Sequence, residues 1–260
     1  MTIKIAFFDI DETIYDGKVK NFAEDAIRSI KQIQANGIKV CLCSSRPNDS
    51  IRHLGCHGQG IVWDAIIGSG GGTAMVGDKP VRLFTIQQDI AERFFSYCND
   101  KGYVFEMIGI QDRHVNKELN ECGREFYTRF IDKEPVISNK LYENLTQFHL
   151  FHTDEHDEEI IKAFPDLCFC RYCWFAVDIV PVVYRKGDAI EDVLKYFGYS
   201  KDEAVGFGDD LQDLSIAENV GTFVAMGNAK DEVKAAAQLI TTNIDDNGIE
   251  NALRKLGLIE

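Results

Sequence analysis

The stretch that decides the fold is IKIAFFDIDET, residues 3–13, in which a run of apolar and aromatic side chains ends in acidic ones. The run from Ile3 to Ile10 is rich in residues that favour β-structure, which is typical of a strand buried on both faces. Apolar residues at helical spacing follow over residues 22–35, and a second apolar strand pattern covers residues 38–43. Because a strand, a helix and a strand joined by short connections form a βαβ unit, the sequence predicts a parallel sheet.

The same alternation returns toward the C-terminal end, after a middle part of different texture. Short strands are expected over residues 65–67, 204–207, 222–225 and 239–241, and helices over residues 188–197, 229–237 and 249–256. Between them, a hairpin around Gly77 and Asp78, a helix over residues 87–101 and further strand patterns indicate a small α+β module. We therefore predict an α/β fold: a doubly wound parallel-sheet core of residues 1–77 and 184–260, with an α+β cap inserted over residues 78–183.

Acidic side chains are in strong excess in the 260 residues, with 28 Lys and Arg against 42 Asp and Glu. The net charge of −14 argues against a nucleic acid or an anionic membrane as a partner, because both favour basic surfaces. It does not exclude an anionic substrate, since the local field of a site need not follow the net charge. No apolar run approaches the roughly 18–20 residues of a membrane span. The N-terminal residues show no signal-peptide pattern, so we expect a cytoplasmic protein.

The eight cysteines include one cluster, Cys168-Phe-Cys170-Arg-Tyr-Cys173. A zinc site there would need a fourth ligand, and the histidines upstream, His149 and His152, stand at no recognised spacing. Alternation along a strand would instead place Cys168 and Cys170 on one face. We favour this shared face over zinc, and without a secretory signal we expect reduced cysteines rather than disulfides.

Polar residues follow the predicted core strands at the edge where ligands bind in an open parallel sheet. Asp9 and Asp11 end the first strand, and the two-residue period of a strand directs both carboxylates toward one site. Ser44, Ser45 and Arg46 end the second strand and offer two hydroxyls and a guanidinium to an oxyanion. Taken alone, the first group would also fit a solvated acidic turn, and the second a helix cap beside a surface arginine.

Two further groups lie in the C-terminal part of the chain. Lys186 stands just before a helix, where it can bind an anion or simply be exposed. The stretch GFGDDLQD, residues 206–213, follows an apolar strand, and its Asp209 and Asp213 can supply oxygen ligands to a hard cation such as Mg²⁺. Because the carboxyl ends of parallel strands meet at one edge of the sheet, we expect all four groups to converge on one site.

In this order, the four groups resemble the motifs of the haloacid dehalogenase superfamily of phosphohydrolases, specifically its Cof-type branch with a large α/β cap. The resemblance covers essentially the whole chain. The motif D-x-D-x-T is matched by Asp9, Asp11 and Thr13, S/T-x-R-P by residues 44–47, the lysine motif by residues 186–187, and G-D-x-x-N-D by residues 208–213. Residues 224–229 and 247–249 match the C-terminal run of this branch.

The resemblance implies a role for each matched residue. Asp9 would be the nucleophile that forms an aspartyl-phosphate, and Asp11 would protonate the leaving group and then activate water. Ser44 and Lys186 complete the implied catalytic set, because both would hold the phosphoryl oxygens. The implied phosphate- or substrate-binding residues are Ser44, Ser45, Arg46, Lys186 and Gln212. The implied Mg²⁺ ligands are Asp9, the backbone carbonyl of Asp11, Asp209 and Asp213, the last as a ligand or just behind the ligands.

The implied activity is that of a Mg²⁺-dependent phosphomonoesterase acting on small phosphorylated metabolites, among which sugar phosphates are prominent. A phosphosugar mutase of the same fold is one alternative. A phosphometabolite-binding protein without turnover is the other, motivated by Glu12, Ser45 and Gln212, where relatives commonly carry Gly, Gly and Asn. Charged side chains mostly face solvent, so which cap residues contact the leaving group stays open among Arg113, His114, Lys117, Arg124, Arg129 and Arg171.

Overall fold

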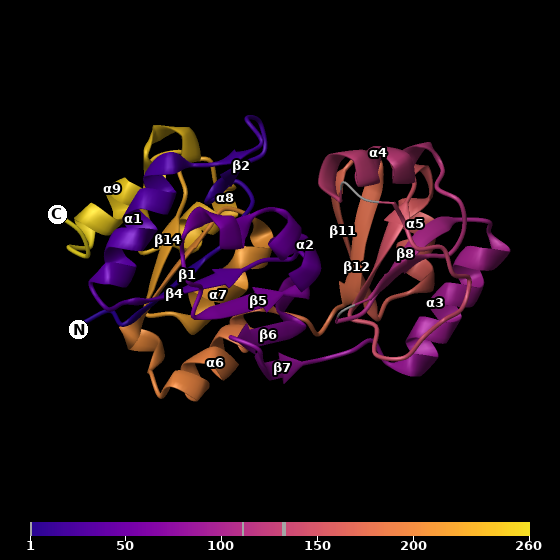
Figure 1. Ribbon diagram of the computed structural model, residues 1–260, viewed down its shortest axis with the longest axis horizontal. Coiled ribbons are helices and arrows are strands. Elements are labelled where there is room, and N and C mark those ends of the chain that lie inside the picture. The colour runs from indigo at the N-terminus through magenta and orange to yellow at the C-terminus, as the bar shows by residue number, and fades with distance from the viewer. Residues whose placement is uncertain (1, 111, 132–133) are drawn as a thin grey trace. The chain divides into compact units, whose positions relative to one another are not determined.

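The computed structural model describes residues 2–110, 112–131 and 134–260 (Figure 1). Contacts within the chain divide it into two compact units. Unit 1 consists of residues 1–46, 55–83 and 185–260, and unit 2 of residues 47–54 and 84–184. In the described part of the chain, no helix combines the length and the apolar character that a membrane span requires.

Within the described residues, unit 1 is built on an eight-stranded sheet with the strand order β15-β14-β13-β1-β4-β5-β6-β7. The strands from β15 to β5 run parallel, whereas β6 and β7 form an antiparallel hairpin at one edge. The bounds are β1 (Ile5–Phe8), β4 (Lys39–Cys43), β5 (Ala65–Gly68), β6 (Thr73–Val76), β7 (Lys79–Leu83), β13 (Ala204–Gly208), β14 (Thr222–Ala225) and β15 (Leu239–Ile240). The parallel sheet predicted from the βαβ pattern is confirmed, and the hairpin around Gly77 extends it.

Strand β1 lies in the middle of this sheet because its four residues are apolar and wholly buried. Phe8 stacks on Phe207 of β13 with ring centroids 4.8 Å apart. From β1 the chain continues to β4 and β5 on one side, while the C-terminal strands β13 to β15 extend on the other. The order of the strands therefore reverses between β1 and β13. Ligands of open α/β sheets bind at such a switch point.

Helices from both parts of unit 1 pack on its sheet (Figure 1). Helix α1 packs against α9 and β4, and α6 packs against α7 and the β5–β7 edge. Helix α1 buries Ala26, Ile30 and Ile33 at helical spacing, as the sequence pattern predicts. The bounds are α1 (Glu24–Ala35), α6 (Lys186–Phe197), α7 (Leu214–Asn219), α8 (Asp231–Ala236) and α9 (Gly248–Lys255), with a small hairpin of β2 (Tyr15–Asp16) and β3 (Asn21–Phe22). The α/β fold class is confirmed.

Unit 2 is an antiparallel sheet with the strand order β11-β12-β10-β8-β9. Its strands are β8 (Val104–Ile108), β9 (Arg113–Val115), β10 (Gln147–Phe151), β11 (Leu167–Cys173) and β12 (Ala176–Pro181). Its helices are α2 (Asn48–His53), α3 (Gln88–Asp100), α4 (Glu121–Phe130) and α5 (Asp157–Ala163). Strand β9 and helix α4 lie in residues 109–144, for which the sequence pattern predicts no element. The side chain of Asn120 caps α4 by accepting the N–H of Gly123 at 2.8 Å.

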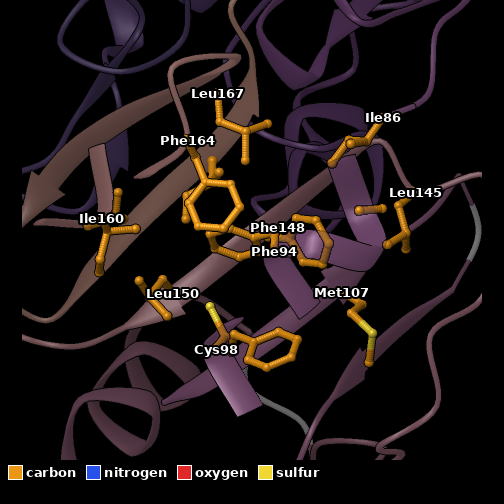
Figure 2. Packing of buried hydrophobic residues seen from close by; sticks show 14 residues of the cluster. Ile86, Phe94, Cys98, Met107, Leu145, Phe148, Leu150, Ile160, Phe164 and Leu167 are labelled. Carbon is orange, nitrogen blue, oxygen red and sulfur yellow. The ribbon is translucent and has the colours of Figure 1, made fainter. Parts of the chain in front are cut away.

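The two faces of the unit 2 sheet differ in what covers them. Alternate strand residues on one face pack against α3 and α5 in an aromatic core that includes Phe94, Phe148 and Phe164 (Figure 2). The rings of Phe94 and Phe148 have centroids 4.8 Å apart. On the other face, α4 places Phe126 beside Phe151 in a smaller apolar cluster. The rest of that face carries polar side chains, which are described below.

Candidate active site

The candidate site lies where β1 and β13 end and α6 begins, at the switch point of the unit 1 sheet. Asp9 directly follows β1, and its backbone N–H donates to the Phe207 carbonyl of β13 at 3.1 Å. Its side chain is buried, with 5% of the residue exposed. A carboxylate in such a place requires a partner, because burial strongly disfavours an isolated charge.

Lys186 supplies that partner from the first residue of α6. Its Nζ donates to Asp9 Oδ1 at 2.6 Å and to Asp213 Oδ1 at 2.7 Å, and the lysine itself is buried. The glycine that follows it is needed for packing, since a Cβ at Gly187 would lie 2.1 Å from the carbonyl oxygen of Ser215. The lysine motif is thus not a surface feature: Lys186 bridges two carboxylates from distant parts of the chain.

Three carboxylates gather around this lysine. Ligand oxygens of Asp9, Asp209 and Asp213 all lie within 4.8 Å of one another. Asp213 accepts the backbone N–H groups of Asp209 and Asp210 on its Oδ2, at 2.9 and 3.0 Å, so this oxygen holds the loop in place. The hydroxyl of Thr13 donates to Asp209 Oδ1 at 3.0 Å. The sequence singled out Thr13 only as a motif position, and the structure shows that it orients one carboxylate of the cluster.

The pKa values in this cluster show that its negative charge is undercompensated. Burial raises the pKa of Asp9 well above its usual range, and the Lys186 ammonium opposes that shift without cancelling it. Burial, together with the charge of Asp213, raises the pKa of Asp209 to about 7. Burial alone would lower the pKa of Lys186, but Asp213 and Asp9 outweigh it and raise that pKa well above normal. One ammonium therefore faces three carboxylates that lie too close together to ionise freely.

This donor set fits a hard divalent cation. Mg²⁺ prefers carboxylate and carbonyl oxygens, and the cluster presents three carboxylates with one charge-compensating lysine. In the described residues, it is also the one group of three or more His, Cys, Asp or Glu side chains close enough to share an ion. Asp9, Asp209 and Asp213 are thus the residues that could hold the predicted Mg²⁺.

Asp11 stands apart from the three clustered carboxylates. Its carboxylate receives two hydrogen bonds from the Arg46 guanidinium, Nε to Oδ2 at 2.8 Å and Nη2 to Oδ1 at 2.7 Å. This bidentate pair joins the end of β1 to the loop after β4, and the Asp11 side chain is about half exposed. The Arg46 guanidinium binds Asp11 in the structure. If Arg46 also contacts phosphate, as the resemblance implies, its guanidinium has to serve both groups.

The Ser44 side chain is wholly buried at the end of β4. Its Oγ accepts the backbone N–H of Arg46 at 3.1 Å, and its carbonyl accepts the N–H of Gly70 at 3.2 Å. Ser44 thereby fixes the turn that presents Ser45 and Arg46. The predicted catalytic, phosphate-binding and metal residues all lie in unit 1, whereas Pro47, the last residue of the second motif, belongs to unit 2.

The departures from the family motifs have local explanations. Ser45 Oγ donates a short hydrogen bond to Gln212 Oε1, so the extra hydroxyl and the longer amide pair with each other. Glu12 adopts a positive φ of 56°, a conformation that favours the glycine common in relatives, and its Oε1 accepts the N–H of Gly17 at 3.1 Å. Asp210 pairs with Lys230 at 2.7 Å. None of these contacts removes a member of the carboxylate–lysine cluster.

One contact that sequence reasoning missed ties the N-terminal motif to the C-terminal run. Asn228 donates from Nδ2 to the backbone carbonyl of Glu12 at 2.8 Å, and its Oδ1 accepts the N–H of Ile244 at 2.9 Å. The signal was present, because Asn228 lies in the stretch 224–229 that matches the family. In the structure, Asn228 holds the loop after β1.

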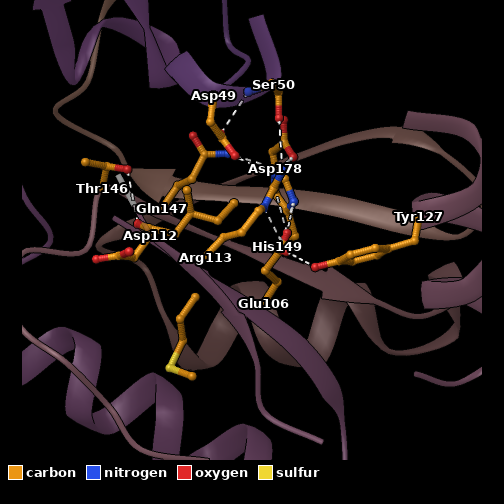
Figure 3. Close-up of polar contacts among 12 residues, drawn as sticks. Asp49, Ser50, Glu106, Asp112, Arg113, Tyr127, Thr146, Gln147, His149 and Asp178 are labelled. Atoms are coloured by element: carbon orange, nitrogen blue, oxygen red, sulfur yellow. Dashed lines mark hydrogen bonds and ion pairs between the residues drawn. The ribbon is translucent and has the colours of Figure 1, made fainter. Parts of the chain in front are cut away.

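Unit 2 carries a second polar cluster, on the same face of its sheet as α4 (Figure 3). Glu106 of β8 is wholly buried and accepts two hydrogen bonds from Arg113, each of 2.9 Å. It also accepts a short hydrogen bond from the Tyr127 hydroxyl and lies 3.0 Å from His149 Nδ1. The Nε2 of the same histidine forms an ion pair with Asp178 Oδ1 at 2.9 Å.

Arg113 and Gln147 complete this cluster. Arg113 also reaches α2, with Nη1 3.1 Å from Asp49 Oδ2 and 3.4 Å from the Ser50 hydroxyl. The Gln147 side-chain amide lies 2.9 Å from His149 Nε2. Of the basic cap candidates, Arg113 is the one that joins this cluster. Lys117, Arg124, Arg129 and Arg171 bond to their own neighbours, and His114 packs on a tyrosine.

At neutral pH this cluster contains both positively and negatively charged side chains. Burial would lower the pKa of His149, but Asp178 and Glu106 together raise it to about 9. Burial would raise the pKa of Glu106, but Arg113 and His149 lower it to about 2. Burial and Glu106 also raise the pKa of Tyr127, so the phenol stays a donor. A buried network of this kind is stable only while its members keep complementary charges.

The stability of unit 2 should therefore fall as the pH rises above about 6.5. The raised pKa of His149 stabilises the fold fully below its unfolded value, and this contribution disappears as the pH passes about 9. A rise of the His149 pKa from 6.5 to about 9 corresponds to a loss of free energy of unfolding on the order of 3 kcal/mol. A Trp63→Phe background leaves Trp174, which lies in unit 2, as the fluorescent reporter of urea unfolding.

His149→Gln is the matched control for this pH dependence. It should lower the free energy of unfolding at pH 6 and flatten its dependence between pH 6.5 and 9. Equal slopes in the variant and the parent would show that folding does not raise the pKa of His149.

Comparison with known proteins assigns the chain to a family, and this family fits the geometry of the site. The chain belongs to the haloacid dehalogenase-like hydrolases, since the model of that family matches residues 6–253. The resemblance recognised from the four motifs is thereby confirmed, and the chain is an enzyme of the phosphatase and phosphotransferase type found in this superfamily.

Particular relatives resemble the chain over its full length. A Bacillus subtilis (strain 168) protein named "Putative phosphatase YkrA" is 27% identical over 274 residues, covering all of both chains. The 5-amino-6-(5-phospho-D-ribitylamino)uracil phosphatase YitU of the same organism is 29% identical over 95% of each chain. Among solved structures, the sugar phosphatase BT4131, of subclass IIB of the superfamily, superposes with a TM-score of 0.83 at 26% identity, covering 98% of this chain and 100% of that one.

Proposed function

We propose that this protein is a Mg²⁺-dependent phosphomonoesterase that hydrolyses small phosphorylated metabolites, with sugar phosphates as the favoured class. The observation that supports this most strongly is the buried Lys186, bonded at once to Asp9 and Asp213 beside Asp209. A phosphate dianion would be repelled by these carboxylates unless cations neutralise them. The names of the relatives point to small phosphorylated substrates and, for one solved structure, to sugars.

The first half-reaction transfers the phosphoryl group to the protein. A carboxylate oxygen of Asp9 attacks phosphorus, the bond from phosphorus to the leaving oxygen breaks, and Asp11 gives its proton to that oxygen as the alcohol departs. Lys186 and Ser44 hold the non-bridging oxygens of the phosphoryl group while the negative charge on these oxygens changes during the transfer. Asp11 lies on the same loop as Asp9 and is half exposed, as this role requires. In the structure both arms of Arg46 bind its carboxylate, so Asp11 has to leave this pair and take up a proton before it acts as the acid.

The second half-reaction regenerates the nucleophile. Asp11, now ionised, takes a proton from water, the water oxygen attacks phosphorus, and the bond from phosphorus to Asp9 breaks to release inorganic phosphate. Asp9, the backbone carbonyl of Asp11, Asp209 and Asp213 would hold Mg²⁺. The bound ion would supply positive charge to the phosphoryl oxygens and to the crowded carboxylates.

We further propose that residues 78–183 form the cap that selects the leaving group, and that the polar cluster of the unit 2 sheet contributes to this selection. Glu106, Arg113, His149 and Asp178 hold one another in fixed positions there, and the Gln147 amide lies 2.9 Å from His149 Nε2. Carboxylate, amide and imidazole groups fixed on a rigid sheet suit hydroxyl groups. This chemistry favours a polyhydroxylated substrate over a purely apolar one.

The proposed activity is tested by a screen for phosphate release from phosphate monoesters with Mg²⁺. The screen should include hexose, pentose and glycol phosphates, and we expect release to be fastest with sugars. Conversion of a hexose 1-phosphate into the 6-phosphate without free phosphate would instead identify a mutase. Binding of these esters without any turnover would identify a binding protein and overturn the proposal.

The metal requirement gives a sharper prediction. A chelator should abolish phosphate release and Mg²⁺ should restore it. Thr13→Val, which removes the hydrogen bond to Asp209 at nearly constant volume, should raise the half-saturating Mg²⁺ concentration by about 10–100-fold. The measurement is a Mg²⁺ titration of the initial rate with a saturating ester. The same titration curve for wild type and Thr13→Val would contradict the assignment of Asp209 as a ligand.

A further inference from the structure

Strand β11 places two cysteines side by side at the edge of the unit 2 sheet. The strand pairs with β12 on one side and ends the sheet on the other. Cys168 is exposed and Cys170 half-buried, and their sulfur atoms lie 3.5 Å apart. The prediction that Cys168 and Cys170 share one face of a strand is therefore correct. The phosphatase chemistry proposed above uses neither thiol.

The two sulfur atoms are close enough to react, but a disulfide between them requires the strand to contract. Residues two apart in a strand have Cα atoms about 6.4–6.8 Å apart, from a rise of about 3.2–3.4 Å per residue. Disulfides accept Cα separations of about 4.4–6.8 Å. The Cα separation lies at the upper end of this range, but two side chains on one strand face point the same way, so their Cβ atoms lie about as far apart as the Cα atoms. A disulfide needs about 3.5–4.5 Å between Cβ atoms, so the strand has to bend locally for the bond to form. A strained and exposed disulfide is readily reduced, as reversible ones are.

The environment of Cys168 also favours reaction. Its thiol neighbour Cys170 lowers the pKa of Cys168 to about 7, which leaves a substantial thiolate fraction at neutral pH. The chain contains an internal comparison with the same spacing, since Cys41 and Cys43 lie two apart on β4. Both are wholly buried in the middle of the unit 1 sheet, and burial raises the pKa of each thiol well above normal. The spacing is shared, but only the edge-strand pair is exposed and ionisable.

Metal binding is the weaker interpretation of the pair. A zinc site needs about four ligands, and in the described residues the one group of three or more candidate ligands within reach of each other is Asp9, Asp209 and Asp213. His149, considered from the sequence, is engaged by Glu106 and Asp178. Two neighbouring thiols without such a group around them favour sulfur–sulfur chemistry.

We propose that Cys168 and Cys170 are a reversible redox site at which a hydroperoxide produces an intrastrand disulfide. The Cys168 thiolate attacks the terminal peroxide oxygen, which gives a sulfenic acid and releases the alcohol or water. The Cys170 sulfur then attacks the Cys168 sulfur and expels water, so one hydroperoxide oxidises two thiols to one disulfide. A dithiol reductant reverses the reaction by exchange.

The test is oxidation of the folded protein with hydrogen peroxide at pH 7, followed by alkylation and mass measurement. We expect two thiols per chain to become protected, a peptide cross-link between Cys168 and Cys170, and full recovery with dithiothreitol. Cys170→Ser should stop the cross-link and slow the first oxidation of Cys168 by about fivefold, because the smaller thiolate fraction outweighs its higher nucleophilicity. Cys173→Ser is the matched control and should leave the cross-link unchanged.

Three outcomes would overturn this proposal. One is stepwise oxidation of Cys168 to sulfinic acid with no cross-link. Another is a cross-link from Cys168 to Cys173 in the wild type. The third is oxidation of Cys41 and Cys43 as fast as the edge pair. The exposed position of Cys168 makes Cys168→Ser safe for folding, so loss of the cross-link in that variant reports chemistry.

Discussion

Asp9→Asn is expected to lower phosphate release by on the order of 10⁴-fold or more while the protein stays folded. The amide keeps the shape of the side chain but is a poor nucleophile and does not form an acyl phosphate. The measurement is the initial rate of phosphate release from the best ester of the screen, with Mg²⁺ present. Asp245→Asn, at an exposed position of unit 1, is the matched control and should retain full activity.

The same variant should not lose stability in the absence of metal. Burial and the neighbouring carboxylates raise the pKa of Asp9 well above normal, so its ionised form is disfavoured in the metal-free fold. A neutral amide at this position would relieve the crowding, and Lys186 would keep its bond to Asp213. Thermal unfolding in a chelator should therefore show a midpoint equal to or above that of the wild type. A wild-type rate of turnover in this variant would refute the role of Asp9 as nucleophile.

Lys186→Met is expected to damage both activity and stability. Its ammonium is the cation that the structure places between Asp9 and Asp213. Without it, these two buried carboxylates and the partly buried Asp209 face one another. Removing one partner of a buried ion pair costs about 3–5 kcal/mol. The loss of a group that holds phosphoryl oxygens should lower turnover by about 10²–10³-fold in addition. Urea unfolding of a Trp174→Phe background reports unit 1 through the buried Trp63.

Two further variants separate the charge effect from a general packing effect. Lys195→Met removes an exposed lysine from the same helix and should change neither the turnover nor the free energy of unfolding. Adding Asp213→Asn to Lys186→Met should recover part of the lost free energy of unfolding, because it removes one uncompensated carboxylate. It should recover none of the activity. Equal destabilisation in the single and double variants would indicate that lost packing, rather than charge, explains the effect.

The sequence predicts the core of this fold well because its signals are local. The apolar run that ends at Asp9 and the glycine-rich stretch before Asp209 each mark a strand end. The strand order then brings those ends together at the switch point. The contacts that escape prediction are between side chains far apart in the chain, such as the pair of Asp11 with Arg46 and that of Ser45 with Gln212. They depend on rotamers and loop packing that no periodicity reveals.

The polar cluster of unit 2 escapes prediction for a different reason. Glu106, His149 and Asp178 each occupy an alternate position in an otherwise apolar strand, a pattern that normally indicates a solvent-facing side chain. Here these positions are buried because opposite charges on adjacent strands satisfy one another. Residues 109–144, which contain Arg113 and Tyr127, show no clear period. The partners of the cluster were therefore not visible in the sequence.

The central claim is that the phosphoryl group passes through Asp9, and an acid-quench experiment tests it most directly. Enzyme with Mg²⁺ is mixed with excess ester, quenched in acid within milliseconds, digested and measured by mass. We predict a phosphoryl adduct on the peptide that contains Asp9, formed before steady-state phosphate release and absent in Asp9→Asn. A phosphoryl adduct on Ser44, or phosphate release by Asp9→Asn at the wild-type rate, would contradict it.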